Sequence, residues 1–280
     1  INQSHTDLKR YSTIKRTPIA PPRGLQKPAT AELTPAAPMP TTAAAQPHKA
    51  AHHRHVRCKL CASPQNCLIG RLPDEHRARL APHIREVTFQ KDECLLTEGV
   101  VSNVIRIIKR GTAMTTRLGP DRQKHAIALL GRGSLMGKFG LFDQVPQLGV
   151  TSVSAGRLCE LRIDDLQKTQ AMDPAFMQSL HTAMVRAFGH LADWSQVGQL
   201  RGLPRQLMAT LLLLCQEQGK AVIQLPSHAA LANLLSTTRG SITRSLHQLA
   251  ELGVLRCIDR VHCEVLKLEL SCIDAVDENV

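Results

Sequence analysis

Aromatic residues are scarce in this chain, which has five Phe, one Tyr and one Trp among 280 residues. Hydrophobic residues still make up 43% of the chain, so its cores must be built mainly from Leu, Ile, Val and Ala. The longest largely apolar run, residues 207–215, is far shorter than the ~20 residues that a membrane-spanning helix needs. The length suits two domains and a tail.

The sequence also lacks the residue arrangements that enzymes use. It has no His/Asp constellation and no glycine loop of the kind that cradles phosphates, so we expect no enzymatic activity. No secretory signal is present, and the nine cysteines are an odd number spread over a long chain. This pattern argues against a disulfide scaffold and predicts a cytoplasmic protein.

Acidic residues are sparse at the start of the chain. Residues 1–57 hold nine Lys/Arg and two acids, a net charge of +7, whereas residues 203–280 hold seven and eight, a net charge of −1. The total of +12 favours a polyanion such as nucleic acid as a partner. Residues 1–56 contain eight prolines and no apolar period, so we predict a disordered Pro/Ala-rich tail.

The middle of the chain reads as short strands and then one long helix. Runs such as "VIRIIKRG" and "AIALLGRG", punctuated by glycines, predict a β-barrel or jelly roll over residues 85–171. A helix over residues 172–202 carries apolar residues at alternating spacings of three and four: Met177, Leu180, Met184, Ala187, Leu191 and Trp194. Spacing alone leaves two interpretations open, a dimer seam or a helix packed on its own barrel.

Residues 203–280 predict a winged helix-turn-helix. Ser227 can cap one short helix and Thr238 a second, and "VLRCIDRVHCEVLKLE" then reads as a β-hairpin. The second helix would enter the major groove of DNA, where Arg can hydrogen-bond guanine. The expected DNA-binding residues are Thr238, Arg239, Ser241, Thr243 and Arg244.

Three cysteines lie within ten residues in "RCKLCASPQNCL", at Cys58, Cys61 and Cys67. A C-x2-C pair is half of a zinc site, whereas a cubane iron–sulfur cluster takes four thiolates, often three from one local loop. Buried thiols or a metal-free thiol switch are further alternatives. Cys257 and Cys263 flank the predicted wing turn, where a redox disulfide is one possibility.

The order of barrel, long helix and winged helix-turn-helix resembles the CRP/FNR family of bacterial transcription regulators. The segments "LLTEGVVSNVIRIIKRGTAM", "GRGSLMGKFGLFD" and "LANLLSTTRGSITRSLHQLAELGVL" carry this resemblance, which covers residues 57–273. It implies an α+β fold, with a cyclic-nucleotide-binding-like β-roll, a dimerisation helix and a DNA-binding domain. It also implies a homodimer on a two-fold symmetric DNA site, with RNA polymerase as a further partner.

Within this family the chain resembles the FNR branch. That branch has a C-x2-C-x5-C motif and a fourth cysteine just before a Glu, which here match Cys58, Cys61, Cys67 and Cys159 in "GRLCELR". The resemblance implies an oxygen-sensing [4Fe-4S] cluster held by these four, in a cysteine loop and short helix over residues 57–84. The cyclic-nucleotide branch is disfavoured, because Lys138 stands where that branch has Glu.

Three positions depart from the family pattern. Gly240 replaces the glutamate that usually reads cytosine, so the half-site is expected to differ. Ser236 replaces a turn glycine. Asp193 is the sole acid from Pro174 to Gln216 and lies off the apolar stripe, so we expect the cluster-free protein to dimerise more readily than in a strict oxygen switch.

Overall fold

The computed structural model describes residue 61 and residues 64–267 of the chain. The predicted disordered tail, Cys58 and residues 268–280 lie outside the described residues. No helix of the described part combines the length and the apolarity needed to cross a membrane.

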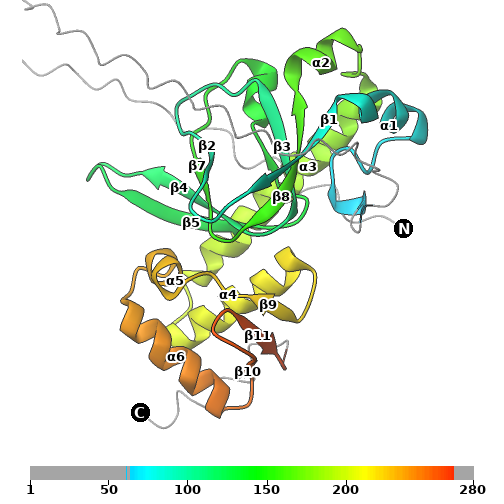
Figure 1. Ribbon diagram of the computed structural model, residues 1–280. Helices are drawn as coiled ribbons and strands as arrows, with labels where there is room; N and C mark the ends of the chain where they lie inside the picture. The colour runs from blue at the N-terminus through cyan, green and yellow to red at the C-terminus, as the bar shows by residue number, and fades with distance from the viewer. Residues whose placement is uncertain (1–60, 62–63, 268–280) are drawn as a thin grey trace, which may run out of the picture. The chain divides into compact units, whose positions relative to one another are not determined.

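Two antiparallel four-stranded sheets form the β-roll (Figure 1). One has the strand order β1-β8-β3-β6 and the other β2-β7-β4-β5. The strands are β1 (Ile84–Phe89), β2 (Cys94–Leu96), β3 (Val104–Arg110), β4 (Ala113–Leu118), β5 (Lys124–Leu130), β6 (Leu135–Met136), β7 (Gly149–Ser152) and β8 (Gly156–Arg162).

A glycine turn closes the roll between β3 and β4. Gly111 has a φ of 100°, which L side chains rarely adopt, and a Cβ there would lie 2.9 Å from the carbonyl oxygen of Ala155 and from the ring of Phe89. Phe89 is buried, and with Leu95, Ile108 and Val150 it forms the core between the sheets. Phe89, one of the few aromatic residues, thus packs its ring closely against the backbone at Gly111.

Short helical segments flank the roll. The 3-10 turn η2 (Pro64–Asn66), helix α1 (Asp74–Leu80) and the 3-10 turn η3 (Ala81–His83) precede β1. The 3-10 turn η4 (Lys138–Phe142) follows β6, and α2 (Ile163–Lys168) follows β8. Leu68, Ile69 and Leu72 of the first segment are buried in a second cluster, against one face of the sheet that contains β1 and β8.

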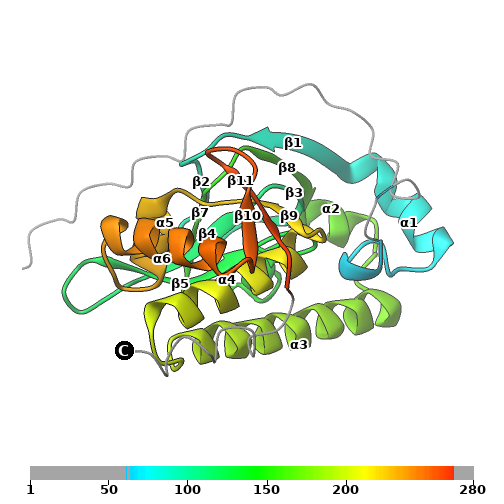
Figure 2. The same ribbon diagram turned by 90° about the horizontal axis from the view of Figure 1, so that it is seen from below.

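Helix α3 (Pro174–Val197) is the longest in the described chain and is seen along its length in Figure 2. Asp173 caps it, with the side chain accepting a hydrogen bond from the Phe176 amide at 3.0 Å. Pro174 suits the first turn, where its missing N–H costs nothing.

The apolar stripe predicted for dimerisation faces the chain itself. Leu180 and Trp194 are buried, and Met177, Met184 and Leu191 pack against the same apolar clusters, with Ala187 half-buried. Leu180 and Trp194 therefore have little or no surface left for a partner, and the expected interface on this stripe stays a prediction. The other interpretation of the spacing, a helix packed on its own domain, describes this stripe.

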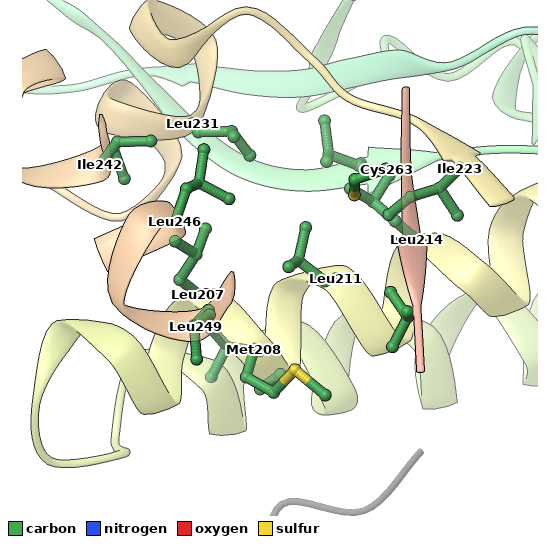
Figure 3. Packing of buried hydrophobic residues seen from close by; sticks show 14 of the residues in the cluster. Leu207, Met208, Leu211, Leu214, Ile223, Leu231, Ile242, Leu246, Leu249 and Cys263 are labelled. Carbon is green, nitrogen blue, oxygen red and sulfur yellow. The ribbon is translucent and has the colours of Figure 1, made fainter. Parts of the chain in front are cut away.

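The C-terminal part is a winged helix-turn-helix. It comprises α4 (Leu203–Gln218), β9 (Val222–Gln224), α5 (His228–Leu234), α6 (Arg239–Glu251), β10 (Leu255–Cys257) and β11 (His262–Val265). Ser227 caps α5 and Thr238 caps α6, as predicted. Leu207 of α4 lies beside Leu249 of α6, and Leu214 lies near Cys263 and Ile223 (Figure 3).

The predicted fold class is confirmed. A β-roll is followed by a long helix and a winged helix-turn-helix, in an α+β chain. The cluster that holds α4 and α6 together also contains Met114, Ala128 and Leu129 of the roll.

Candidate functional site

Three of the four predicted cluster ligands lie in described parts of the structure. Cys61 precedes η2, Cys67 follows it, and Cys159 lies in β8 directly opposite Glu86 of β1. Cys67 and Cys159 are half-buried, and both pack against the apolar cluster between the N-terminal segment and the sheet. The fold thus brings residues 92 positions apart to one side of the roll.

Electrostatics places Cys61 in the same region. Burial raises the pKa of Cys67, two backbone hydrogen bonds oppose this rise, and the neighbouring Cys61 adds to it. Burial by itself would lower the pKa of Lys109. The hydrogen bond to Glu86, and then the charges of Cys159 and Cys61, outweigh this effect and raise the pKa. Both thiols therefore lie within electrostatic range of the same ammonium group.

Cations surround these thiols. Lys109 Nζ lies 2.7 Å from one carboxylate oxygen of Glu86, and Arg157 Nη1 lies 3.1 Å from the other. Arg71 lies close enough to Cys67 for each to affect the other's pKa, and its Nη2 is buried without a hydrogen-bond partner. The region has more positive than negative charge, which suits an anionic group.

The thiols do not form a complete metal site by themselves. Among residue 61 and residues 64–267, no three His, Cys, Asp or Glu side chains are grouped closely enough to hold a metal ion. The fourth predicted ligand, Cys58, lies outside the described residues. The donor set is nevertheless all thiol, which is the chemistry that iron–sulfur clusters require.

Side chains bind the cysteine loop to α3, a link that the sequence analysis missed. Ser179 Oγ donates to the carbonyl of Leu68 at 2.7 Å, and Arg186 Nη1 donates to the carbonyl of Asn66 at 3.2 Å. No periodic signal marks these residues, because each contact joins positions more than a hundred residues apart. These two hydrogen bonds join the cysteine loop directly to α3.

The recognition helix presents a polar, cationic face. Ile242, Leu246 and Leu249 are buried, while the expected DNA-binding residues Thr238, Arg239, Thr243 and Arg244 are exposed. Ser241 is half-buried and its hydroxyl lies 2.9 Å from that of Thr238, so it belongs mainly to the helix cap.

Neighbouring residues add to this face. The Thr243 hydroxyl donates to the carbonyl of Arg239 at 3.1 Å and lies 2.9 Å from His228 Nδ1 of α5, which fixes its orientation. His228, which is half-buried, and the exposed residues His247 and Arg260 of the wing are cationic or titratable groups that the sequence analysis left out. A Cβ at Gly240 would lie 4.0 Å from its nearest neighbour, Thr238 Oγ1, so packing does not require glycine there.

A cavity of about 460 Å³ lies between the roll and α3. Its lining includes Lys138, Arg132 and Arg186 beside apolar residues such as Leu96 and Val150. Burial lowers the pKa of Lys138, whose Nζ lies 5.2 Å from the centre of the Phe139 ring. Lys138, at the position where the cyclic-nucleotide branch has Glu, is thus a partly desolvated amine in the cavity wall.

Two models of known protein domains match this chain, one in the β-roll and one in the C-terminal part. A cyclic nucleotide-binding domain model matches residues 86–172, and a Crp-like helix-turn-helix domain model matches residues 205–270. The cyclic AMP receptor protein of Thermus thermophilus is 28% identical over 179 residues, which cover 64% of this chain and 79% of that protein.

Solved structures share the fold at low identity. The structure of FixK2 from Bradyrhizobium japonicum superposes with a TM-score of 0.56 at 18% identity, over 66% of this chain and 93% of that one. The c-di-GMP-responsive regulator CLP of Xanthomonas campestris gives a TM-score of 0.54 at 15% identity, over 70% and 100% of the two chains. The sensor-type roll and the Crp-like DNA-binding unit follow one another in the same chain, which is the domain order of CRP-type DNA-binding transcription regulators.

Proposed function

We propose that this regulator responds to oxygen through a [4Fe-4S] cluster held by Cys58, Cys61, Cys67 and Cys159. The observation that carries the proposal is the convergence of Cys61, Cys67 and Cys159 on one side of the roll, although Cys159 comes from a distant strand. Cys58, three residues before Cys61 in the same loop, completes the set of four thiols.

The residues present fit such a group. A cubane cluster with four thiolates carries a net charge of about −2, and Arg71, Lys109 and Arg157 lie close to the cysteines in space or in sequence. When bound, the cluster would supply an oxygen-labile link between the loop and β8. A zinc site made of four cysteines usually pairs two C-x2-C units, and Cys159 has no such companion.

The chain's own contacts supply the route from the loop to the helix. With the loop held against β8, the carbonyls of Asn66 and Leu68 stay in place to accept from Arg186 and Ser179. Release of the loop removes these contacts and frees one face of α3. The equilibrium between dimer and monomer then shifts by mass action.

The homodimer would form through the exposed stripe of α3. Val185 and Phe188 are 71% and 76% exposed, unusually high fractions for large apolar side chains. They lie on a different side of the helix from Leu180 and Trp194, and Val185 is nearly opposite Trp194. Pairing would place two recognition helices about 34 Å apart, one turn of DNA, on a two-fold symmetric site with RNA polymerase nearby.

The test is to purify the protein without oxygen and analyse its metal. We expect a brown protein with about four irons and four sulfides per chain, bleached by air, with bleaching accompanied by loss of DNA binding. Replacing Cys159 by Ser should abolish the colour. The matched control is Cys94→Ser, which removes an exposed thiol from β2 and should leave the iron content unchanged.

Two outcomes would overturn the proposal. A colourless protein that carries zinc would assign the thiols to a zinc or thiol-redox site. A cyclic nucleotide that enters the cavity beside Lys138 and strengthens DNA binding with no iron present would assign control to the roll instead.

A further inference from the structure

Cys257 and Cys263 lie directly opposite each other in the wing hairpin. β10 and β11 are antiparallel, and their register pairs these two residues. The flanking amides of Ile258 and Leu266 donate to the carbonyls of His262 and Val254, at 3.0 and 2.9 Å. Since hydrogen-bonded and non-hydrogen-bonded pairs alternate, the two cysteines form a non-hydrogen-bonded pair, in which Cα atoms lie ~4.5 Å apart.

This separation falls within the range that a disulfide can span. The side chains also point to the same face of the hairpin. Arg256 forms an ion pair with Glu264 on the outer face, so the alternation of the strands places the cysteines together on the inner face. Figure 3 shows Cys263 beside Ile223, near Leu214 of α4.

The two thiols differ in access to solvent. Cys263 is fully buried, and burial raises its pKa to about 12, with Cys257 and Cys215 adding to the rise. Cys257 is exposed at the rim of the same face. An oxidant from solvent therefore meets Cys257 first, and Cys263 is the covered thiol behind it.

We propose that Cys257 and Cys263 form a reversible disulfide in the wing when the protein meets a hydroperoxide, a modification site separate from the cysteines assigned to iron. The Cys257 thiolate attacks one peroxide oxygen. An S–O bond forms, the O–O bond breaks, and the departing hydroxide takes a proton to become water.

The Cys263 thiol then attacks the sulfur of the Cys257 sulfenic acid. The S–S bond forms as the S–O bond breaks, and the proton of Cys263 leaves with the hydroxyl as a second water. Two thiols and one hydrogen peroxide thus give one disulfide and two waters, and two electrons pass from sulfur to oxygen. Thiol reductants reverse the change by exchange.

Cys215 is the competing partner. It lies on α4, half-buried, and its thiol is directed at the carbonyl of Ala221, 4.0 Å away. Exposed Cys94, by contrast, lies opposite Thr151 in the roll and has no cysteine across the sheet. The cross-strand register therefore favours Cys263 over either alternative.

Trypsin provides a direct test on the full-length chain. Cleavage after Arg256, Arg260 and Lys267 leaves Cys257 and Cys263 in two separate peptides, residues 257–260 and 261–267. After treatment with hydrogen peroxide and blocking of remaining thiols with iodoacetamide, we expect these two peptides joined, two hydrogens lighter than their sum, and separated by reductant.

Matched variants show which thiols are needed. Cys257→Ser should abolish the linked peptide and leave Cys263 reduced, whereas Cys94→Ser should leave the link unchanged. Cys263→Ala should leave a sulfenic acid at Cys257 that dimedone captures. The link should also form in the Cys159→Ser protein, because it requires no iron.

Other products would overturn the inference. Linkage of residues 257–260 to the peptide that contains Cys215 would assign the bridge to the wrong thiol. Peroxide that converts Cys257 to sulfinic acid with Cys263 still free would show that the pair does not close. Either result would leave the proposal for Cys58, Cys61, Cys67 and Cys159 untouched.

Discussion

Ser236, in the turn between the two DNA-reading helices, adopts a φ of 49°. Serine stands here where the resembling family has glycine, and its backbone still takes the left-handed form. For a residue with a Cβ this conformation costs about 1 kcal/mol or more. The chain thus tolerates local strain at a turn held by the Ser236 amide, which donates to the carbonyl of Asn233 at 3.3 Å.

Replacing Ser236 by Gly should therefore stabilise the protein. We expect the free energy of unfolding to rise by roughly 0.5 to 1 kcal/mol, since the relief of strain outweighs the added freedom of the unfolded chain. Denaturant titration gives the value. The control is Thr237→Gly, one residue on, whose φ is not positive and whose replacement should lower stability.

Asp173 ties the helix start to the cysteine segment. It accepts from the Phe176 amide, pairs with His76 of α1, and lies 3.1 Å from Arg79. The hydrogen bond from Phe176, followed by the contacts with His76 and Arg79, lowers the pKa of Asp173. A depressed folded-state pKa contributes stability above the unfolded-state value of ~3.9 and loses it as pH falls.

Asp173→Ala should cost about 1 kcal/mol of unfolding free energy at neutral pH, mainly through the lost cap. The difference from the native protein should shrink below about pH 4, as the native carboxylate becomes protonated. Denaturant titrations at several pH values measure it. An unchanged difference at low pH would contradict the assignment, and Asp193→Ala, for which no cap is lost, is the control.

Helix α3 shows that the periodicity of apolar residues predicts a helix without showing what its apolar face packs against. Spacings of three and four correctly predicted a helix with an apolar face, but they did not say what covers that face. The structure packs Leu180 and Trp194 into the chain's own clusters and exposes Val185 and Phe188. Asp193 lines the cavity, so its charge lies away from the exposed stripe.

Phe188→Glu should weaken self-association more than ten-fold, because pairing would bury an unpaired charge. Sedimentation at micromolar concentration measures the effect in both the iron-loaded and the iron-free protein. The control is Leu118→Glu, an equally polar change at a 52% exposed apolar residue of β4. Equal effects of the two variants would argue against the α3 stripe.

In the whole molecule, one apolar cluster spans the β-roll and the DNA-binding unit. Leu129 of β5 is fully buried in the same cluster as Leu249 of α6 and the chain's single tryptophan, Trp194. Shared burial couples the two parts, because removing side chains from either one weakens the packing of both.

Leu129→Ala and Leu249→Ala should each lower the free energy of unfolding by about 2 to 5 kcal/mol. Both should shift one common transition, followed by circular dichroism and by Trp194 fluorescence. Leu158→Ala, a matched truncation in the separate core between the sheets, provides the comparison. Two resolved transitions, each moved by one variant alone, would show that the parts unfold independently.

The sequence alone determined the order of elements and the helix caps at Ser227 and Thr238, because local propensity and spacing encode them. The four-cysteine set follows only from the family resemblance and stays a prediction. Tertiary structure decided which face of α3 stays exposed, how Arg186 and Ser179 hold the cysteine loop, and that Cys257 lies opposite Cys263. These features depend on packing and on strand register between residues distant in the chain, and neither leaves a periodic signal in the sequence.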